Sequence, residues 1–282
     1  MSLFQIIFIV GGTFLIIHII ILFFIGFNFI KLYWKTLFSK NIFMALLMPT
    51  LIYAKYQKDK LNDKDKITNF IKDINKSNLT IAIMIFILLG LLDFYKILNY
   101  IQNNGLLKTI FIIFGYMIIW ATISRSLEIF YAFYKDSISQ LSIEKNNSHL
   151  KYYERIQLAM RSYIELILNY AIFYFVYINL ISLYDIDISS ILPEFKIYNI
   201  IDSFYYSIVT ITTLGYGDIH PNSNIYSIPI KLVSSFQVIN GFILIIVSFT
   251  IYVSKSLEAK EYKNNQSSTD SKIYTVTIYK EK

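Results

Sequence analysis

The chain has 282 residues, of which 55% are hydrophobic and only 16% are charged, and its mean hydropathy is +0.50. A soluble domain carries about 25% charged residues, so this composition excludes an ordinary soluble protein and indicates an integral membrane protein. The chain has no cysteine, which excludes disulfides and thiolate metal sites, and its net charge of +7 raises the question of nucleic-acid binding.

Five apolar runs are each long enough to cross a hydrocarbon core, which takes roughly 20 helical residues. They are residues 3–30, 79–101, 106–123, 163–184 and 228–253. The first run lacks a basic leading segment and a small-residue cleavage site, so we expect a span rather than a removable signal peptide. Two further apolar stretches, residues 42–54 and 200–214, are too short to span. The pattern predicts an all-α membrane protein with five transmembrane helices.

The basic residues divide unevenly between the two sides of these five spans. The loop 31–78, the segment 125–162 and the tail from Lys255 carry 22 of the 26 Lys and Arg residues. Counting residues 42–54 as a sixth span would weaken the division to 19 against 7. Because basic residues favour the cytoplasmic side, we expect a multi-pass cell-membrane protein with its N-terminus outside and its C-terminus in the cytoplasm. The charge is then an orientation signal that also suits anionic lipids, and no nucleic-acid partner is expected.

In this topology residues 185–227 lie outside, between the fourth and fifth spans. Asp202–Thr212 is predicted to be a helix, with Asp202 or Ser203 as its N-cap. A helix of about 11 residues extends only about 16 Å, so it dips halfway into the membrane and the chain must return. The returning segment is Thr212–Asp218. Irregular backbone at that depth occurs only where it is buried in protein or lines a watery path.

The returning segment reads Thr-Thr-Leu-Gly-Tyr-Gly-Asp. Gly215 and Gly217 tolerate positive φ, which lets successive carbonyls turn to one side and replace the water around a cation. The preceding helix would direct its negative dipole end toward the membrane centre. A plain surface turn is the alternative for a Gly-Asp pair, but its place after a half-span helix favours an ion path.

The stretch from Tyr205 to Pro221 resembles the pore module of tetrameric potassium channels over 17 consecutive positions. The resemblance covers roughly residues 163–255, and the three N-terminal spans are not matched. It implies a pore domain at 163–255 between an N-terminal membrane region, 1–162, and a cytoplasmic tail, 256–282. It also implies a fourfold assembly around a central pore, a homotetramer, because each chain supplies one of four filter strands.

The same resemblance assigns the selectivity filter. It implies K+ coordination by the carbonyls of Thr213, Leu214, Gly215 and Tyr216, with Gly217 completing the filter. Leu214 replaces the usual Val or Ile, which leaves the carbonyl unchanged. Permeant K+ is the only bound ion expected, and no cofactor is expected.

Residues around the filter are assigned in the same way. Tyr216 is expected to pack against Tyr205 and Tyr206 of the pore helix, and Asp218 to hydrogen-bond to that aromatic cuff. His220 falls at the outer mouth, where protonation between about pH 5 and 8 would add charge. The alternative for His220 is a solvated side chain with no effect on current.

In the fifth span Gly241 aligns with the glycine at which many family members bend. Close helix packing by a small residue is the equal alternative. Phe242, Ile245, Phe249 and Val253 share one helical face, which the resemblance assigns to the inner cavity, where large side chains gate by dewetting. Lipid or helix contact is the competing interpretation of that face.

Polar residues inside the spans have structural interpretations. Asp93 and Lys96 are expected to pair on one face of the second span. Gln237 and Asn240 are expected to hydrogen-bond between helices.

Other functions are less well supported. No span carries Arg or Lys at every third position, so an S4-type voltage sensor is not expected. No nucleophile constellation or metal-ligand spacing occurs, so we do not expect an enzyme. A weakly selective cation channel is disfavoured by Tyr216. A non-conducting membrane subunit with a vestigial pore module is the other alternative.

Overall fold

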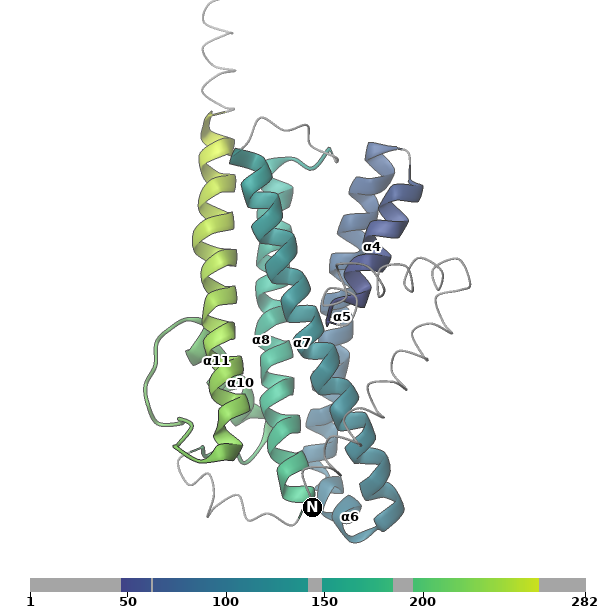
Figure 1. Cartoon of the computed structure of the whole chain (residues 1–282), viewed down its shortest axis with the longest axis vertical. Coiled ribbons are helices and arrows are strands. Elements are labelled where there is room, and N and C mark those ends of the chain that lie inside the picture. Colours follow the sequence, from purple (N-terminus) through teal and green to yellow (C-terminus); the bar gives the residue numbers. More distant parts are fainter. Residues whose placement is uncertain (1–46, 62, 142–148, 185–194, 259–282) are drawn as a thin grey trace, which may run out of the picture.

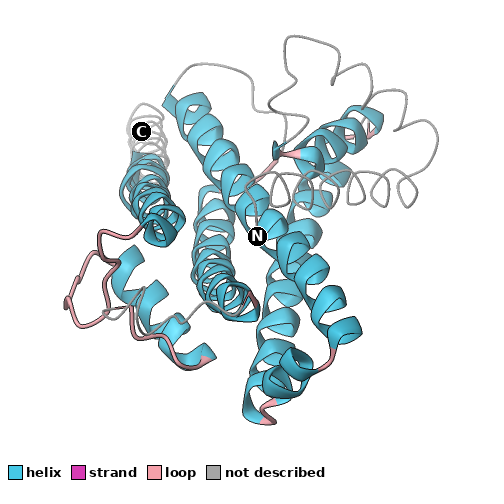
Figure 2. Ribbon diagram, turned by 60° about the horizontal axis from the view of Figure 1, so that its bottom comes forward, coloured by secondary structure: helices cyan, strands magenta, loops and turns pink. Residues whose placement is uncertain are grey.

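The computed structural model describes residues 47–61, 63–141, 149–184 and 195–258, and every regular element among them is a helix (Figure 2). The elements are α4 (Pro49–Lys60), α5 (Lys64–Phe94), α6 (Ile97–Asn103), α7 (Gly105–Leu141), α8 (Tyr152–Leu183), α10 (Ile200–Ile211), the short 3-10 helix η1 (Ile225–Ser227), α11 (Ile228–Gly241) and the π-helix η2 (Phe242–Phe249). The predicted first span, residues 3–30, and almost all of the predicted tail lie outside the described residues.

Four of these helices are long and apolar enough to cross a membrane: α5, α7, α8 and the continuous helix Ile225–Glu258 that contains α11 and η2. The prediction of an all-α, multi-pass membrane protein is therefore confirmed for the described part of the chain. In Figure 1 the start of α5, the end of α7, the start of α8 and the end of the last helix lie toward one end of the bundle. We call this the Lys-rich end, because described basic residues such as Lys64 at the start of α5, Lys151 before α8 and Lys255 in the last helix lie there.

The predicted bounds of the second span, residues 79–101, are wrong at both ends. Helix α5 begins at Lys64, well before the apolar run, because Asp63 caps it by accepting a hydrogen bond from the Asp65 backbone N–H at 3.0 Å. It ends at Phe94 because Lys96 adopts a left-handed φ of 52° that no helix interior tolerates. The remainder of the predicted span forms the separate short helix α6.

Helices α7 and α8 also extend past their apolar runs toward the Lys-rich end. Helix α8 starts at Tyr152, where the Glu154 carboxylate accepts the Lys151 N–H at 2.9 Å. The same carboxylate pairs with Lys72 of α5 at 2.7 Å. Caps and ion pairs of this kind satisfy polar groups in the added turns of a spanning helix. The lengths of the apolar runs therefore underestimate the lengths of these helices.

Helix α8 occupies the middle of the bundle, between α5, α7 and the last helix (Figure 1). Its side chains are largely buried by these neighbours and by α10. Its core cluster mixes aliphatic and aromatic side chains, with Phe173, Tyr174 and Tyr206 packed among Ile and Leu residues.

A buried ion network joins α7 to α8. Arg125 donates through Nε and Nη2 to both oxygens of Glu165, at 2.6 and 3.3 Å, and through Nη1 to Glu128 at 3.2 Å. Both carboxylates are almost fully buried. Charged groups at membrane depth are costly unless partnered, so this network fixes the register of α7 against α8.

Candidate functional site

The short helix α10 has 12 residues, Ile200–Ile211, and lies against α8 and α11. At 1.5 Å per residue it extends about 18 Å, less than the hydrocarbon core. Its N-cap is Asn199, whose side-chain oxygen accepts the Asp202 N–H at 2.9 Å, while Asp202 accepts the Asn199 N–H at 3.2 Å. The predicted caps, Asp202 and Ser203, are wrong, because Asp202 fills the third helical position of this reciprocal capping box.

The segment after α10 has an alternating backbone. Thr213, Gly215 and Gly217 have φ values of 59°, 56° and 77°, whereas the intervening Leu214 and Tyr216 do not adopt positive φ. Alternation between the two signs of φ turns successive carbonyls toward the same side of the strand. The two glycines adopt this conformation freely, but Thr213 bears strain of about 1–3 kcal/mol, as is typical of functional sites.

The same segment lies open on the surface of a single chain. Leu214 is 58% exposed and Tyr216 is 67% exposed, and Thr213 and the two glycines are exposed as well. A polar backbone at membrane depth must be covered by protein or must face a water-filled path.

Tyr205 of α10 contacts the segment at two points. Its ring stacks on that of Tyr216 with a centroid distance of 6.5 Å and an interplanar angle of 3°. Its hydroxyl donates to Oδ2 of Asp218 at 2.8 Å. Tyr205, Tyr216 and Asp218 therefore form one unit behind the strand. His220, two residues further on, is exposed.

Tyr206 points elsewhere. Its ring makes edge contacts with Tyr174 and Phe195, at centroid distances of 4.8 and 5.0 Å, and its hydroxyl lies 3.0 Å from Oγ of Ser234. We expected Tyr206 to pack against Tyr216, but within one chain it is buried in the core instead. A helix turns 100° per residue, so two adjacent tyrosines cannot both face the strand. Tyr206 thus anchors α10 to α8 and α11.

A buried glutamine holds the middle of α10. Gln237 of α11 donates to the Ser207 carbonyl at 2.8 Å and to the Ser207 hydroxyl at 2.9 Å, and it accepts the Tyr174 hydroxyl at 2.7 Å. The Ser207 hydroxyl in turn donates to the Ile167 carbonyl of α8 at 2.7 Å. The predicted interhelical role of Gln237 is confirmed. The sequence did not predict the roles of Ser207 and Tyr174, because single Ser and Tyr residues are common in apolar runs.

Asn240 lies one turn further along α11. It donates to the Tyr170 hydroxyl at 2.6 Å and to the Ser126 carbonyl at 3.4 Å, which joins the last helix to both α7 and α8. Its predicted interhelical hydrogen bonding is also confirmed.

Gly241 marks the end of α11 and touches the end of α10. A β-carbon at this position would lie 2.9 Å from Cγ1 of Ile211 and 2.9 Å from the Ile211 carbonyl oxygen. Such distances exclude a side chain, so Gly241 allows the last helix to approach the C-terminus of α10. The π-helix η2 begins at the next residue, and π-helical segments frequently occur at functional sites.

The predicted face of large residues on the last helix includes part of the π-helix η2 (Phe242–Phe249), and its members differ in exposure within a single chain. Phe242 and Phe249 are exposed, as expected, but Ile245 is half-buried and Ile246 is 49% exposed. Hydrogen bonds in a π-helix join residue i to residue i+5, so each turn holds more residues than in an α-helix. A spacing argument based on 3.6 residues per turn therefore selects Ile245 where Ile246 is the more exposed residue.

The last helix is held by α7 at the Lys-rich end. The Ser137 hydroxyl donates to Oγ of Ser248 at 2.9 Å, and Ser248 donates to the Ile243 carbonyl at 3.0 Å, five residues earlier. One turn further on, Tyr252 donates to Oδ2 of Asp136 at 2.6 Å. Serines on a spanning helix give no sequence signal for such a pairing, because they are equally common at simple packing contacts.

At the opposite end, Asp93 contacts α10 instead of its predicted partner Lys96. Its Oδ2 accepts the backbone N–H of Ile200 at 2.9 Å. The predicted pair fails because the left-handed Lys96 interrupts the helix and removes the regular three-residue spacing. No sequence pattern pointed from residue 93 to residue 200.

Part of the chain matches a known protein family. Residues 164–257 match the family model described as "Ion channel". This match confirms the resemblance to a potassium-channel pore module for these residues. The comparisons with curated proteins and with solved structures gave no significant match.

Proposed function

We propose, from the membership of residues 164–257 in the ion channel family, that four copies of this chain form a potassium-selective channel. The observation that carries the proposal is the alternation of positive φ at Thr213, Gly215 and Gly217 on an exposed strand that follows a half-span helix. The carbonyls of Thr213, Leu214, Gly215 and Tyr216 would replace the hydration shell of K+ on the central axis. Oxygens on four chains would form the successive ion sites.

The surroundings of the strand suit this role. Helix α10 ends at Ile211, two residues before Thr213, so its negative dipole end points toward the ion path and stabilises a cation there. The stacked ring of Tyr205 and its bond to Asp218 hold the strand from behind. Such bracing keeps the oxygens at the separation that fits K+.

The proposed orientation places the Lys-rich end in the cytoplasm, with five spans once residues 3–30 are included and the N-terminus outside. Anionic lipid headgroups would interact with the Lys side chains at that face. The channel would lack an S4-type sensor, because Arg125 in α7 is tied to Glu165 and Glu128 and the next basic residue of that helix is Lys135. An arginine paired with two buried carboxylates is not free to move through the membrane field.

The test is planar-bilayer recording of the purified chain with KCl on one side and NaCl on the other. We expect a reversal potential close to the K+ equilibrium value. Equal permeability would instead identify a weakly selective cation channel. Protein that assembles but never conducts would point to a non-conducting subunit. The mass of the detergent-solubilised protein tests the fourfold assembly separately, since one chain has a mass of 33.1 kDa.

A further inference from the structure

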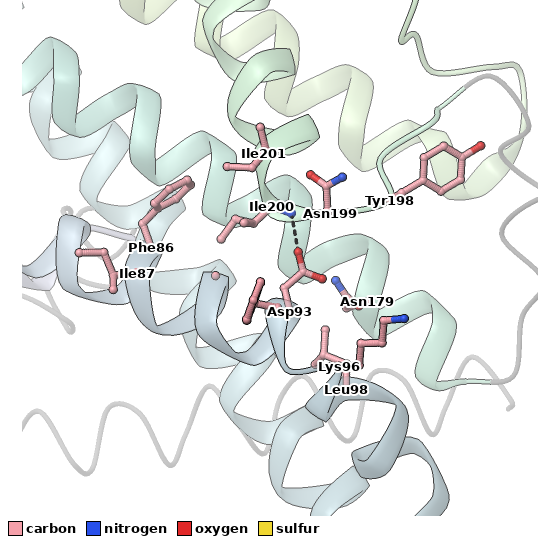
Figure 3. A pocket seen from close by; sticks show the side chains of 12 residues that line it. Phe86, Ile87, Asp93, Lys96, Leu98, Asn179, Tyr198, Asn199, Ile200 and Ile201 are labelled. Carbon is pink, nitrogen blue, oxygen red and sulfur yellow. Dashed lines mark hydrogen bonds between the residues drawn. The ribbon is translucent and has the colours of Figure 1, made fainter.

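One face of α5 lies against the start of α10, although α5 is outside the residues that match the ion channel family. The rings of Phe86 and Phe204 are 5.5 Å apart. A β-carbon on Gly90 would lie 3.7 Å from Cγ2 of Ile200, and Oδ2 of Asp93 lies 2.9 Å from the Ile200 backbone nitrogen (Figure 3). Residues 86, 90 and 93 are four and three apart, so they share one helical face.

The bond from Asp93 satisfies a particular group of α10. The first N–H groups of any helix lack a partner within the helix. In α10 the Asn199 side chain serves the Asp202 N–H, and Asp93 serves the Ile200 N–H across 107 positions of sequence. A carboxylate at a helix N-terminus also interacts favourably with the helix dipole, and hydrogen bonds to a charged acceptor are about twice as strong as neutral ones.

The contact combines this hydrogen bond with the packing of Phe86 on Phe204 and of Gly90 on Ile200. A cavity of about 730 Å³ lies beside it, lined by residues of α5, α6, α8 and the start of α10. Figure 3 shows Asp93 reaching from α5 toward the backbone of Ile200 at this cavity. The Asp93 carboxylate therefore supplies a polar contact between α5 and α10 at the edge of this cavity.

Three contacts then fix the position of α10 at its start, middle and end. Gln237 holds the middle through Ser207, and Gly241 allows the last helix to abut Ile211 at the end. Asp93 holds the start. Because a helix of 12 residues is short, losing the contact at its start would let it tilt about its held middle, which would move its end and Thr213, two residues later.

We propose that Asp93 is a positioning residue for the proposed filter, through which α5 of the N-terminal membrane region sets the conducting geometry. This inference rests on the proposed K+ channel function. The N-terminal region then has a structural role in selectivity. Helix α5 positions the start of α10 through Asp93, and loss of this hydrogen bond lowers the affinity of the filter for K+.

The test compares Asp93→Ala with Asp73→Ala. Asp73 is an exposed residue of the same helix, so the second variant is a matched control for the loss of an aspartate from α5. We measure the K+ concentration, c, that the tetramer needs to resist thermal unfolding, because a bound ion stabilises the folded state by RT ln(1 + c/Kd), so a weaker ion site needs more K+. Asp93→Ala should raise the required K+ concentration by about tenfold, and Asp73→Ala should leave it unchanged.

A double-mutant cycle identifies the hydrogen bond itself. Ile200→Pro removes the donor N–H at a position where proline suits a helix start, and the extended Asn199 before it (φ −146°) suits a residue preceding proline. Adding Asp93→Ala to Ile200→Pro should cause no further change in K+ requirement. An Asp93→Ala effect of equal size in both backgrounds, or one no larger than that of Asp73→Ala, would overturn the inference. Asp93→Asn, which keeps an acceptor oxygen without the charge, should lie between parent and Asp93→Ala and replaces it if the alanine variant fails to assemble.

The outcome is separate from that of the proposed function. If the parent chain shows no K+ selectivity in the bilayer, the channel proposal fails whatever the variants do. If the parent is K+-selective and Asp93→Ala matches the parent in both thermal stability and reversal potential, only the role of Asp93 fails.

Discussion

The Tyr252 hydroxyl, at the Lys-rich end of the last helix, donates a 2.6 Å hydrogen bond to Asp136 of α7. The other oxygen of Asp136 pairs with Arg155 near the start of α8. One carboxylate therefore joins three helices at the level where the last helix leaves the bundle. The neighbouring bond between Ser137 and Ser248 strengthens the same junction.

Tyr252→Phe should lower the free energy of unfolding by about 1–2 kcal/mol, because it removes a buried hydrogen bond to a charged acceptor while keeping the ring. The measurement is thermal unfolding in detergent. Tyr198→Phe is the matched control, since Tyr198 is 80% exposed. The reversal potential should not change, because this junction is far along the last helix from Gly241 and the filter strand. A shift in reversal potential without a loss of stability would contradict this assignment.

Tyr205→Phe should weaken K+ selectivity and speed the decay of K+ current. The substitution keeps the ring that stacks on Tyr216 but removes the 2.8 Å hydrogen bond to Asp218, so the strand loses one of its two braces. Recording under mixed K+ and Na+ tests this, again beside Tyr198→Phe. Parent-like current from Tyr205→Phe would show that stacking alone suffices.

Gly241→Ala should destabilise the protein by about 1–3 kcal/mol, the usual cost of overpacking. Its new β-carbon would lie 2.9 Å from the backbone oxygen of Ile211, which cannot rotate away. Gly90→Ala is the control, since its β-carbon would meet Ile200 at an ordinary 3.7 Å. Thermal unfolding separates the two interpretations of Gly241. Altered gating at unchanged stability would favour a hinge over close packing.

Gly215→Ala should abolish K+ selectivity, because an alanine at φ of 56° costs about 1–2 kcal/mol in each chain and the strand would relax away from it. Gly105→Ala, at the start of α7 with nothing within 4 Å of the added carbon, should behave like the parent. The bi-ionic reversal potential measures both. Retained K+ selectivity in Gly215→Ala would mean that the left-handed conformation at residue 215 is not needed for ion coordination.

Much of the pore module could be predicted from the sequence, because its constraints are local. A half-span helix followed by Gly-Tyr-Gly restricts the backbone through chain length and φ alone. The contact of Tyr205 with Asp218 was implied by the resemblance to potassium channels, and the structure shows it. Gln237 could be assigned an interhelical hydrogen bond because an amide in an apolar run must find a partner.

The rest depends on distant residues or on helix geometry. The pairing of Asp93 with Ile200 joins positions that no short-range rule connects, and the left-handed Lys96 removed the local pairing that a helical rule predicted. Ile246 is more exposed than Ile245 because the segment is a π-helix, and no residue in that segment predicts a π-helix. Helix ends were misjudged because capping residues such as Asp63 lie outside the apolar runs.

The exposure of Leu214 and Tyr216 in the single chain has a genetic consequence under the proposed fourfold assembly. Each chain contributes only a quarter of every ion site, so one altered copy distorts the oxygens that the other three present. Damaging alleles of the filter strand should therefore be dominant over the normal allele. Alleles that prevent a chain from assembling should be recessive, because the excluded copy leaves the remaining assemblies intact.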